Sequence, residues 1–150
     1  MIKFISYILG WGQDSDSIDK LIDHINSKRD HCRILYEGIK RGVEYEDYLL
    51  SCDIGLCSQD QDAEYNDCSF PSKILTYLSA NLKVICTDVY AVKESSVADM
   101  IYFIDSNSPE ELAEAVKKVD ALAIPDTRIK MADLNATMQE EIDMLIDNDR

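Results

Sequence analysis

The chain has 150 residues, of which 46% are apolar and 29% charged; this composition suits a single globular domain and excludes a disordered or collagen-like chain. Its 29 acidic and 15 basic residues leave a net charge of −14. This argues against nucleic-acid binding and against attraction to an anionic membrane, because both need a positive face. The five cysteines form no C-x-x-C pair, so we expect reduced thiols in a cytoplasmic protein, without a disulfide framework or a metal site.

Short apolar strands alternate with amphipathic helices along the chain. The first strand is expected at residues 4–9, and a helix with its N-cap at Asp16 or Ser17 is expected at 17–25. Further strands are expected at 33–36, 53–57, 84–87 and 101–104, and further helices at 44–51, 71–80, 92–98, from 108 to about 119, and 127–146. Five such repeats predict an α/β fold with one Rossmann-like parallel sheet and helices on both faces. In such sheets ligands bind at the carboxyl ends of the strands.

The domain boundary is expected near residue 125. Residues 1–125 then form a Rossmann-like domain, and residues 126–150 form a C-terminal amphipathic helix. The apolar stripe of that helix, which includes Ile129, Met138 and Leu145, could pack on this domain or on a partner domain. The N-terminal apolar run is too short to span a bilayer, so we expect no transmembrane segment.

The helix expected at 71–80 carries the strongest local signal for a binding site. Pro71 is expected at its first position and Asn81 at a left-handed stop, with Ile74, Leu75 and Leu78 facing the core. The N–H groups of Ser72 and Lys73, the Lys73 ammonium and the hydroxyls of Ser69 and Ser72 would then converge on an anion. The alternative is a capped helix with a solvated lysine.

Three other motifs give weaker signals for a functional site than the helix expected at 71–80. Gly10-Trp11-Gly12 occupies the place of a dinucleotide fingerprint but lacks the third glycine. The strand ends also lack the acidic cluster and terminal aspartate of a phosphoacceptor receiver. The two D-x-D pairs, at 14–16 and 60–62, are best explained as solvated acidic loops.

Four blocks between residues 34 and 119 resemble the C-terminal, donor-nucleotide half of GT-B glycosyltransferases of the glycosyl transferases group 1 kind. They are Tyr36-Glu37-Gly38 followed by 44–56, Phe70-Pro71-Ser72-Lys73 continuing to Asn81, the strand at 83–88, and the Ser108-Pro109-Glu110-Glu111 helix start. The order and the spacing of the blocks fit as well as their letters do, which makes the four together more specific than any one of them.

The resemblance implies a Rossmann-like domain that holds a nucleotide-diphospho-sugar as its substrate, with no further cofactor. The implied contacts are Ser69, Phe70, Ser72 and Lys73 for the diphosphate, Thr76 for the ribose, Gly38, Ile39 and Lys40 for the nucleobase, and Gly10 and Gly12 for a loop near the donor. No residue is assigned a catalytic role. The family's Glu-x7-Glu pair falls on Cys68 and Thr76, so both carboxylates are absent.

By this resemblance the chain is the donor-binding part of a glycosyltransferase of surface polysaccharide biosynthesis. The glycan or lipid-linked acceptor would bind an N-terminal domain outside these 150 residues, so the chain alone is expected to be inactive. Two alternatives stay open: a catalytically inactive GT-B-like binding or scaffold module, and half of a nucleotide-sugar epimerase.

Overall fold

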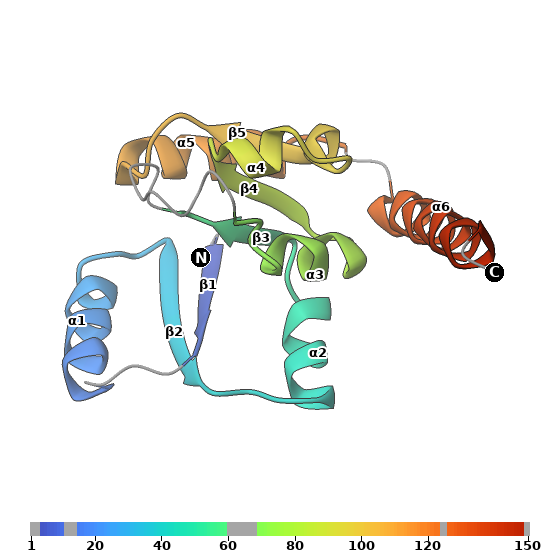
Figure 1. Ribbon diagram of the computed structural model, residues 1–150. Coiled ribbons are helices and arrows are strands. Elements are labelled where there is room, and N and C mark those ends of the chain that lie inside the picture. Colours follow the sequence, from blue (N-terminus) through green and yellow to red (C-terminus); the bar gives the residue numbers. More distant parts are fainter. Residues whose placement is uncertain (1–3, 11–14, 60–68, 124–125, 149–150) are drawn as a thin grey trace. The chain divides into compact units, whose positions relative to one another are not determined.

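The computed structural model describes residues 4–10, 15–59, 69–123 and 126–148 (Figure 1). Packing divides the chain into two compact units, an N-terminal unit of residues 1–48 and a C-terminal unit of residues 49–150. The expected α/β class with parallel strands is confirmed. The strands are hydrogen-bonded as two sheets, one per unit, where one continuous sheet was expected.

The N-terminal unit contains a two-stranded parallel sheet and a helix. Strand β1 (Phe4–Leu9) pairs with β2 (Cys32–Gly38), and α1 (Ser15–Ser27) packs against β2. The Asn26 side chain joins helix to strand, because its amide donates to the Ile34 carbonyl at 2.8 Å and accepts from the Ile34 N–H at 2.9 Å. Helix α1 begins at Ser15, so Asp16 lies in its first turn and the expected N-cap at Asp16 or Ser17 is wrong.

The C-terminal unit is built on a three-stranded parallel sheet. Its strands, in the order β3-β4-β5, are β3 (Ile54–Cys57), β4 (Lys83–Thr87) and β5 (Ile101–Ile104). Alternate residues of β4 enter two hydrophobic clusters: Val84 and Cys86 pack beside α3 (Lys73–Ser79), whereas Ile85 packs beside α5 (Pro109–Asp120). Because alternate strand residues point to opposite faces, the two helices cover opposite faces of this sheet, as expected (Figure 1).

The start of α5 and the end of α3 follow the sequence signals. Ser108 caps α5, since its hydroxyl accepts from the Glu111 N–H at 3.2 Å, and Pro109 is the first helical residue. After α3, Asn81 adopts a left-handed φ of 62°, and the Leu82 N–H donates to the Tyr77 carbonyl at 2.9 Å. This bond, from an N–H group to the carbonyl five residues earlier, is the one that defines a Schellman motif.

The expected helix at 92–98 is wrong. A single helical turn, α4 (Tyr90–Lys93), is followed by non-helical turns and then by the 3₁₀ helix η2 (Ala98–Met100). The Ser95 hydroxyl donates to the Val92 carbonyl at 2.6 Å, and the Ala98 N–H donates to the Ser95 carbonyl. A serine that bonds the nearby backbone in this way competes with a continuing helix.

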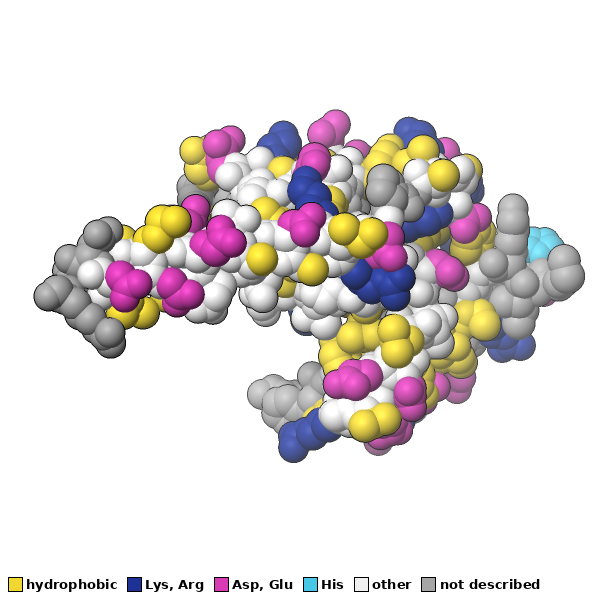
Figure 2. Space-filling model, turned by 90° about the vertical axis from the view of Figure 1, so that its right-hand side faces the viewer, with side chains coloured by type: hydrophobic (Ala, Val, Ile, Leu, Met, Phe, Trp, Pro, Cys, Tyr) yellow, Lys and Arg dark blue, Asp and Glu magenta, His cyan; other side chains and the backbone are white. Residues whose placement is uncertain are grey.

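Helix α6 (Thr127–Asn148) has a packed beginning and an exposed remainder. It lies beside α3, and Met131 and Leu134 pack against the cluster that contains Ile74 and Leu78. Farther along, Met138 and Leu145 are exposed, and the charged residues after Lys130 are all acidic up to residue 148 (Figure 2). Among the described residues, no helix combines the length and apolarity needed to cross a membrane.

We expect Thr127→Val to lower the free energy of unfolding by about 1–2 kcal/mol, because it removes a buried hydrogen-bond donor without changing the side-chain shape. The Thr127 hydroxyl donates to the Leu78 carbonyl at 2.6 Å, and the Thr127 N–H donates to Asn81 Oδ1 at 2.9 Å. The matched control is Thr137→Val on the exposed part of α6, where the change should stay below about 0.5 kcal/mol. Urea denaturation measures both, and equal losses would contradict the anchoring role of Thr127.

Candidate functional site

The predicted anion-binding residues surround the start of α3. This helix begins at Lys73, two residues later than expected. The Ile74 N–H donates to the Pro71 carbonyl at 3.0 Å, a tight turn that precedes the first helical bond, from the Thr76 N–H to the Ser72 carbonyl at 3.4 Å. Pro71 therefore lies ahead of the helix, and its expected place as the first helical residue is wrong.

The two faces of α3 separate core residues from the predicted ligand contacts. Ile74 and Leu78 are fully buried, as expected, but Leu75 is 40% exposed, so its predicted core position is wrong. Tyr77 takes its place and packs against the core. Ser72 and Lys73 are exposed and Thr76 is half-buried.

The two residues before Pro71 differ in their packing. Ser69 is exposed, whereas Phe70 is half-buried and packs against the hydrophobic cluster behind α3. Phe70 thereby fixes this segment to the core. The structure thus brings the predicted residues Ser69, Phe70, Ser72, Lys73 and Thr76 into one short segment of the C-terminal unit.

The carboxyl ends of the three strands are tied together next to this segment. Buried Thr87, the last residue of β4, accepts from the Gln59 N–H at 2.9 Å and donates to the Gln59 carbonyl at 3.1 Å. Asn107, which follows β5, donates to the same carbonyl at 2.6 Å. These three hydrogen bonds, from two side chains, hold the Gln59 backbone after β3.

Lys73 has no ion pair within the described part of the chain. Its positive charge acts on the thiol of Cys57, the last residue of β3. Two carboxylates near the carboxyl ends of β4 and β5 have other partners: Asp88 pairs with Lys93, and Glu111 accepts from the Ser106 hydroxyl at 2.5 Å and from the Asp105 N–H at 2.8 Å. The Ser106 hydroxyl is the main cause that lowers the pKa of Glu111.

Two cysteines that the sequence places only near the ends of separate strands, as small hydrophobic residues, are paired in the structure. Cys57 and Cys86 are paired in register on β3 and β4, and both are buried in one cluster. A hydrogen bond with Cys86 lowers the pKa of the Cys57 thiol to about 7, and the same bond raises the pKa of Cys86. Aligning the ends of the two predicted strands would have been the only signal for this pair.

Two of the predicted residues in the N-terminal unit, Gly10 and Gly38, lie together at the end of its sheet. The Gly10 N–H donates to the Gly38 carbonyl at 2.9 Å, and the Tyr36 hydroxyl donates to the Gly10 carbonyl at 3.1 Å. Gly38 has a left-handed φ of 65°, which favours glycine. The pairing shifts register here, because Ile8 faces Tyr36 whereas Leu9 faces Gly38.

Lys40, a predicted nucleobase neighbour, is held by acidic partners. Its ammonium is 2.8 Å from Glu44 and 3.9 Å from Glu37, and it lies 5.3 Å from the centre of the Tyr48 ring. The hydrogen bond to Glu44 is the main cause that raises the pKa of Lys40. The Tyr48 hydroxyl donates to Glu37 at 2.6 Å, which raises the pKa of Tyr48. Neighbouring Ile39 is exposed.

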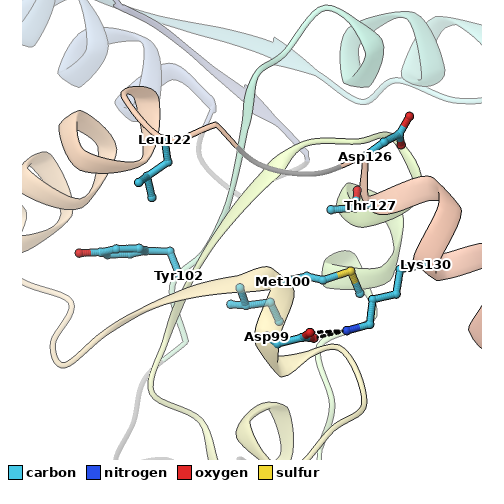
Figure 3. Close-up of a pocket in the computed structure, with 8 residues that line it drawn as sticks. Asp99, Met100, Tyr102, Leu122, Asp126, Thr127 and Lys130 are labelled. Atoms are coloured by element: carbon cyan, nitrogen blue, oxygen red, sulfur yellow. Dashed lines mark hydrogen bonds and ion pairs between the residues drawn. The ribbon is translucent and has the colours of Figure 1, made fainter.

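A pocket of about 300 Å³ lies at the amino end of β5, away from the predicted residues (Figure 3). Its lining residues are Asp99, Met100, Ile101, Tyr102, Leu122, Asp126, Thr127 and Lys130. The charged groups in it pair with one another or with a neighbour: Asp99 with Lys130, and Asp126 with Arg128. The lining residues that the structure describes therefore present no unpaired charge to a ligand.

Comparisons of the chain with protein-family models, curated proteins and solved structures found no match. The predicted residue Gly12 and the position Cys68 lie outside the described residues. Within the described ranges, no group of three or more His, Cys, Asp or Glu side chains is placed to hold a metal ion.

Proposed function

We propose that the C-terminal unit binds the diphosphate of a nucleotide-diphospho-sugar, as the donor-binding part of a glycosyltransferase. The observation that carries this proposal is Lys73, a cation without an ion pair among the described residues, at the first turn of α3 and beside the end of β3. Parallel α/β sheets bind ligands at this edge. The four sequence blocks that resemble GT-B donor domains support the same assignment.

The segment 69–73 offers a diphosphate several hydrogen-bond donors. The hydroxyls of exposed Ser69 and Ser72 are available to donate, and the exposed Lys73 ammonium supplies a full positive charge. Within the described part of the chain, the N–H groups of Ser72 and Lys73 donate to no backbone carbonyl. Bonds from a cation to a phosphate oxygen are stronger than neutral ones, so Lys73 is the main contact in this proposal.

In the proposed reaction these donors stabilise the departing nucleoside diphosphate. Negative charge grows on the diphosphate as the bond from the sugar breaks, so donors already aimed at it lower the barrier. Thr76 offers the ribose one hydroxyl. We assign no general base, since Glu111 and Asp88 are held by Ser106 and Lys93.

Calorimetric titration with UDP and GDP tests the proposal. We expect Lys73→Ala to weaken nucleoside diphosphate binding about fivefold, because one exposed cation contact contributes about 1 kcal/mol. The matched control is Lys117→Ala on α5, which removes an equal charge from an exposed pair with Glu114 and should leave the affinity unchanged. Equal affinity in wild type and Lys73→Ala would refute the assignment of Lys73.

A catalytically inactive binding or scaffold module is the second candidate. It is favoured by Thr76, which stands half-buried where the resembled family has a carboxylate. This candidate predicts no binding of nucleoside diphosphates at millimolar concentration, together with a stable oligomer in light scattering. Measured binding of UDP or GDP that depends on Lys73 would exclude it.

A further inference from the structure

The thiols of Cys57 and Cys86 are placed as a pair by the pairing of β3 with β4. The two residues face each other in register, and neighbouring strands lie about 4.8 Å apart. Registered residues of parallel strands point to the same face, and both side chains enter the cluster that also contains Ile74 and Leu78. A disulfide needs Cα atoms about 4.4–6.8 Å apart, so the backbone already meets that requirement.

The two thiols differ in exposure and in charge environment. Cys57 ends β3 and is 5% exposed, whereas Cys86 is fully buried. Among the described residues, the charged groups that act on the pair are Lys73 of α3, which favours the thiolate of Cys57, and Asp88 after β4, which disfavours ionisation of Cys86. Because Cys57 is the more exposed thiol and is favoured as a thiolate, we assign it as the nucleophile of the pair and Cys86 as its neutral neighbour.

We propose that Cys57 and Cys86 form a dithiol site that a small peroxide oxidises reversibly to a disulfide. This site goes beyond the proposed diphosphate binding and does not depend on it. A water-sized oxidant suits a thiol that reaches the surface only at a strand end.

The reaction proceeds in two balanced steps. The Cys57 thiolate attacks one peroxide oxygen, an S–O bond forms, the O–O bond breaks, and hydroxide leaves and takes up a proton to become water. The Cys86 thiol then loses its proton and attacks the sulfur of the Cys57 sulfenic acid. The S–S bond forms, the S–O bond breaks and a second water leaves. Two thiols are oxidised, one peroxide is reduced to two waters, and an added thiol reductant restores the dithiol.

Peptide mapping of the full wild-type chain after exposure to hydrogen peroxide tests the proposal. Digestion with trypsin and an aspartate-directed protease separates the two thiols from the other cysteines, on fragments 53–59 and 84–87. We expect one species that joins these fragments and is lighter than their sum by two hydrogens. It should disappear after treatment with dithiothreitol. It should form faster at about pH 8 than at about pH 6, because the Cys57 thiolate increases through its pKa of about 7.

Two single variants separate the roles of the thiols. In Cys86→Ala the joined species should be lost and Cys57 should proceed to sulfinic acid, whereas in Cys57→Ala we expect Cys86 to remain a thiol. Because the main result is read on the wild-type chain, a variant that fails to fold does not prevent the test. The proposal is overturned if wild-type Cys57 stays reduced, if it joins another cysteine, or if it becomes sulfinic acid while Cys86 stays a free thiol.

Discussion

Replacing Leu78 with alanine is expected to lower the free energy of unfolding by about 2–5 kcal/mol, the range for truncating a fully buried leucine. Leu78 is 0% exposed, and it lies in the cluster shared by α3, β4 and α6. Its removal takes apolar surface out of that cluster and leaves a cavity that the close-packed neighbours fill only in part. The free energy is measured by urea denaturation followed by far-ultraviolet circular dichroism.

The matched control is Leu75→Ala, which deletes the same atoms three residues earlier in α3. Leu75 is 40% exposed, so its truncation should lower the free energy of unfolding by less than about 1 kcal/mol. The pair of variants measures which face of α3 is buried. Equal losses would mean that the helix is rotated from the orientation described above, with Ser72, Lys73 and Thr76 no longer together on the open face.

The orientation of α3 shows how far periodicity determines the fold. The spacing of apolar residues predicted a helix here, with Ile74 and Leu78 in the core, because both residues lie on one helical stripe. The spacing does not predict whether Leu75 or Tyr77 is the third residue of α3 that packs against the core. That choice depends on β3, where Gly55 leaves room for the Tyr77 ring, and a contact between residues 22 positions apart has no local signal.

Sequence patterns also do not predict hydrogen bonds between residues that are far apart in the chain. Asn81 was predicted as a left-handed stop, since asparagine tolerates a positive φ. Its second role, as acceptor for Thr127 at the start of α6, joins residues 46 positions apart. For the same reason the number of sheets could not be predicted, because apolar runs specify that strands exist but leave the choice of neighbours open.

In the candidate site, too, local sequence patterns predict some features and long-range contacts determine the others. The helix period correctly separated Ser72, Lys73 and Thr76 from the buried face of α3. The groups that surround each predicted lysine depend instead on strand pairing and on contacts between elements, which the helix period does not predict. The charge of Lys73 acts on Cys57 at the end of β3, whereas Lys40 pairs with Glu37 and Glu44. Two lysines predicted to contact one ligand therefore differ in how much charge they can offer it.

A methyl group added at Gly55 should destabilise the C-terminal unit as overpacking does, by about 1–3 kcal/mol for Gly55→Ala. A Cβ atom built at Gly55 would lie 2.5 Å from Cγ and from Cδ2 of the Tyr77 ring and 3.0 Å from Tyr77 Cβ. A change of side-chain rotamer at the far end of the ring does not relieve this clash, because the close atoms are those nearest the Tyr77 backbone. Either α3 or β3 must therefore shift.

A double-mutant cycle tests whether the Tyr77 ring causes the destabilisation expected for Gly55→Ala. Tyr77→Ala alone should cost stability through lost packing, but in its presence Gly55→Ala should cost less than it does in the wild-type chain, with a coupling free energy of about 0.5–3 kcal/mol. Additive losses in urea denaturation would contradict a direct clash. Gly55 lies on the strand that ends at Cys57, and Tyr77 lies on the helix that begins at Lys73, so this contact joins the two elements that carry these residues.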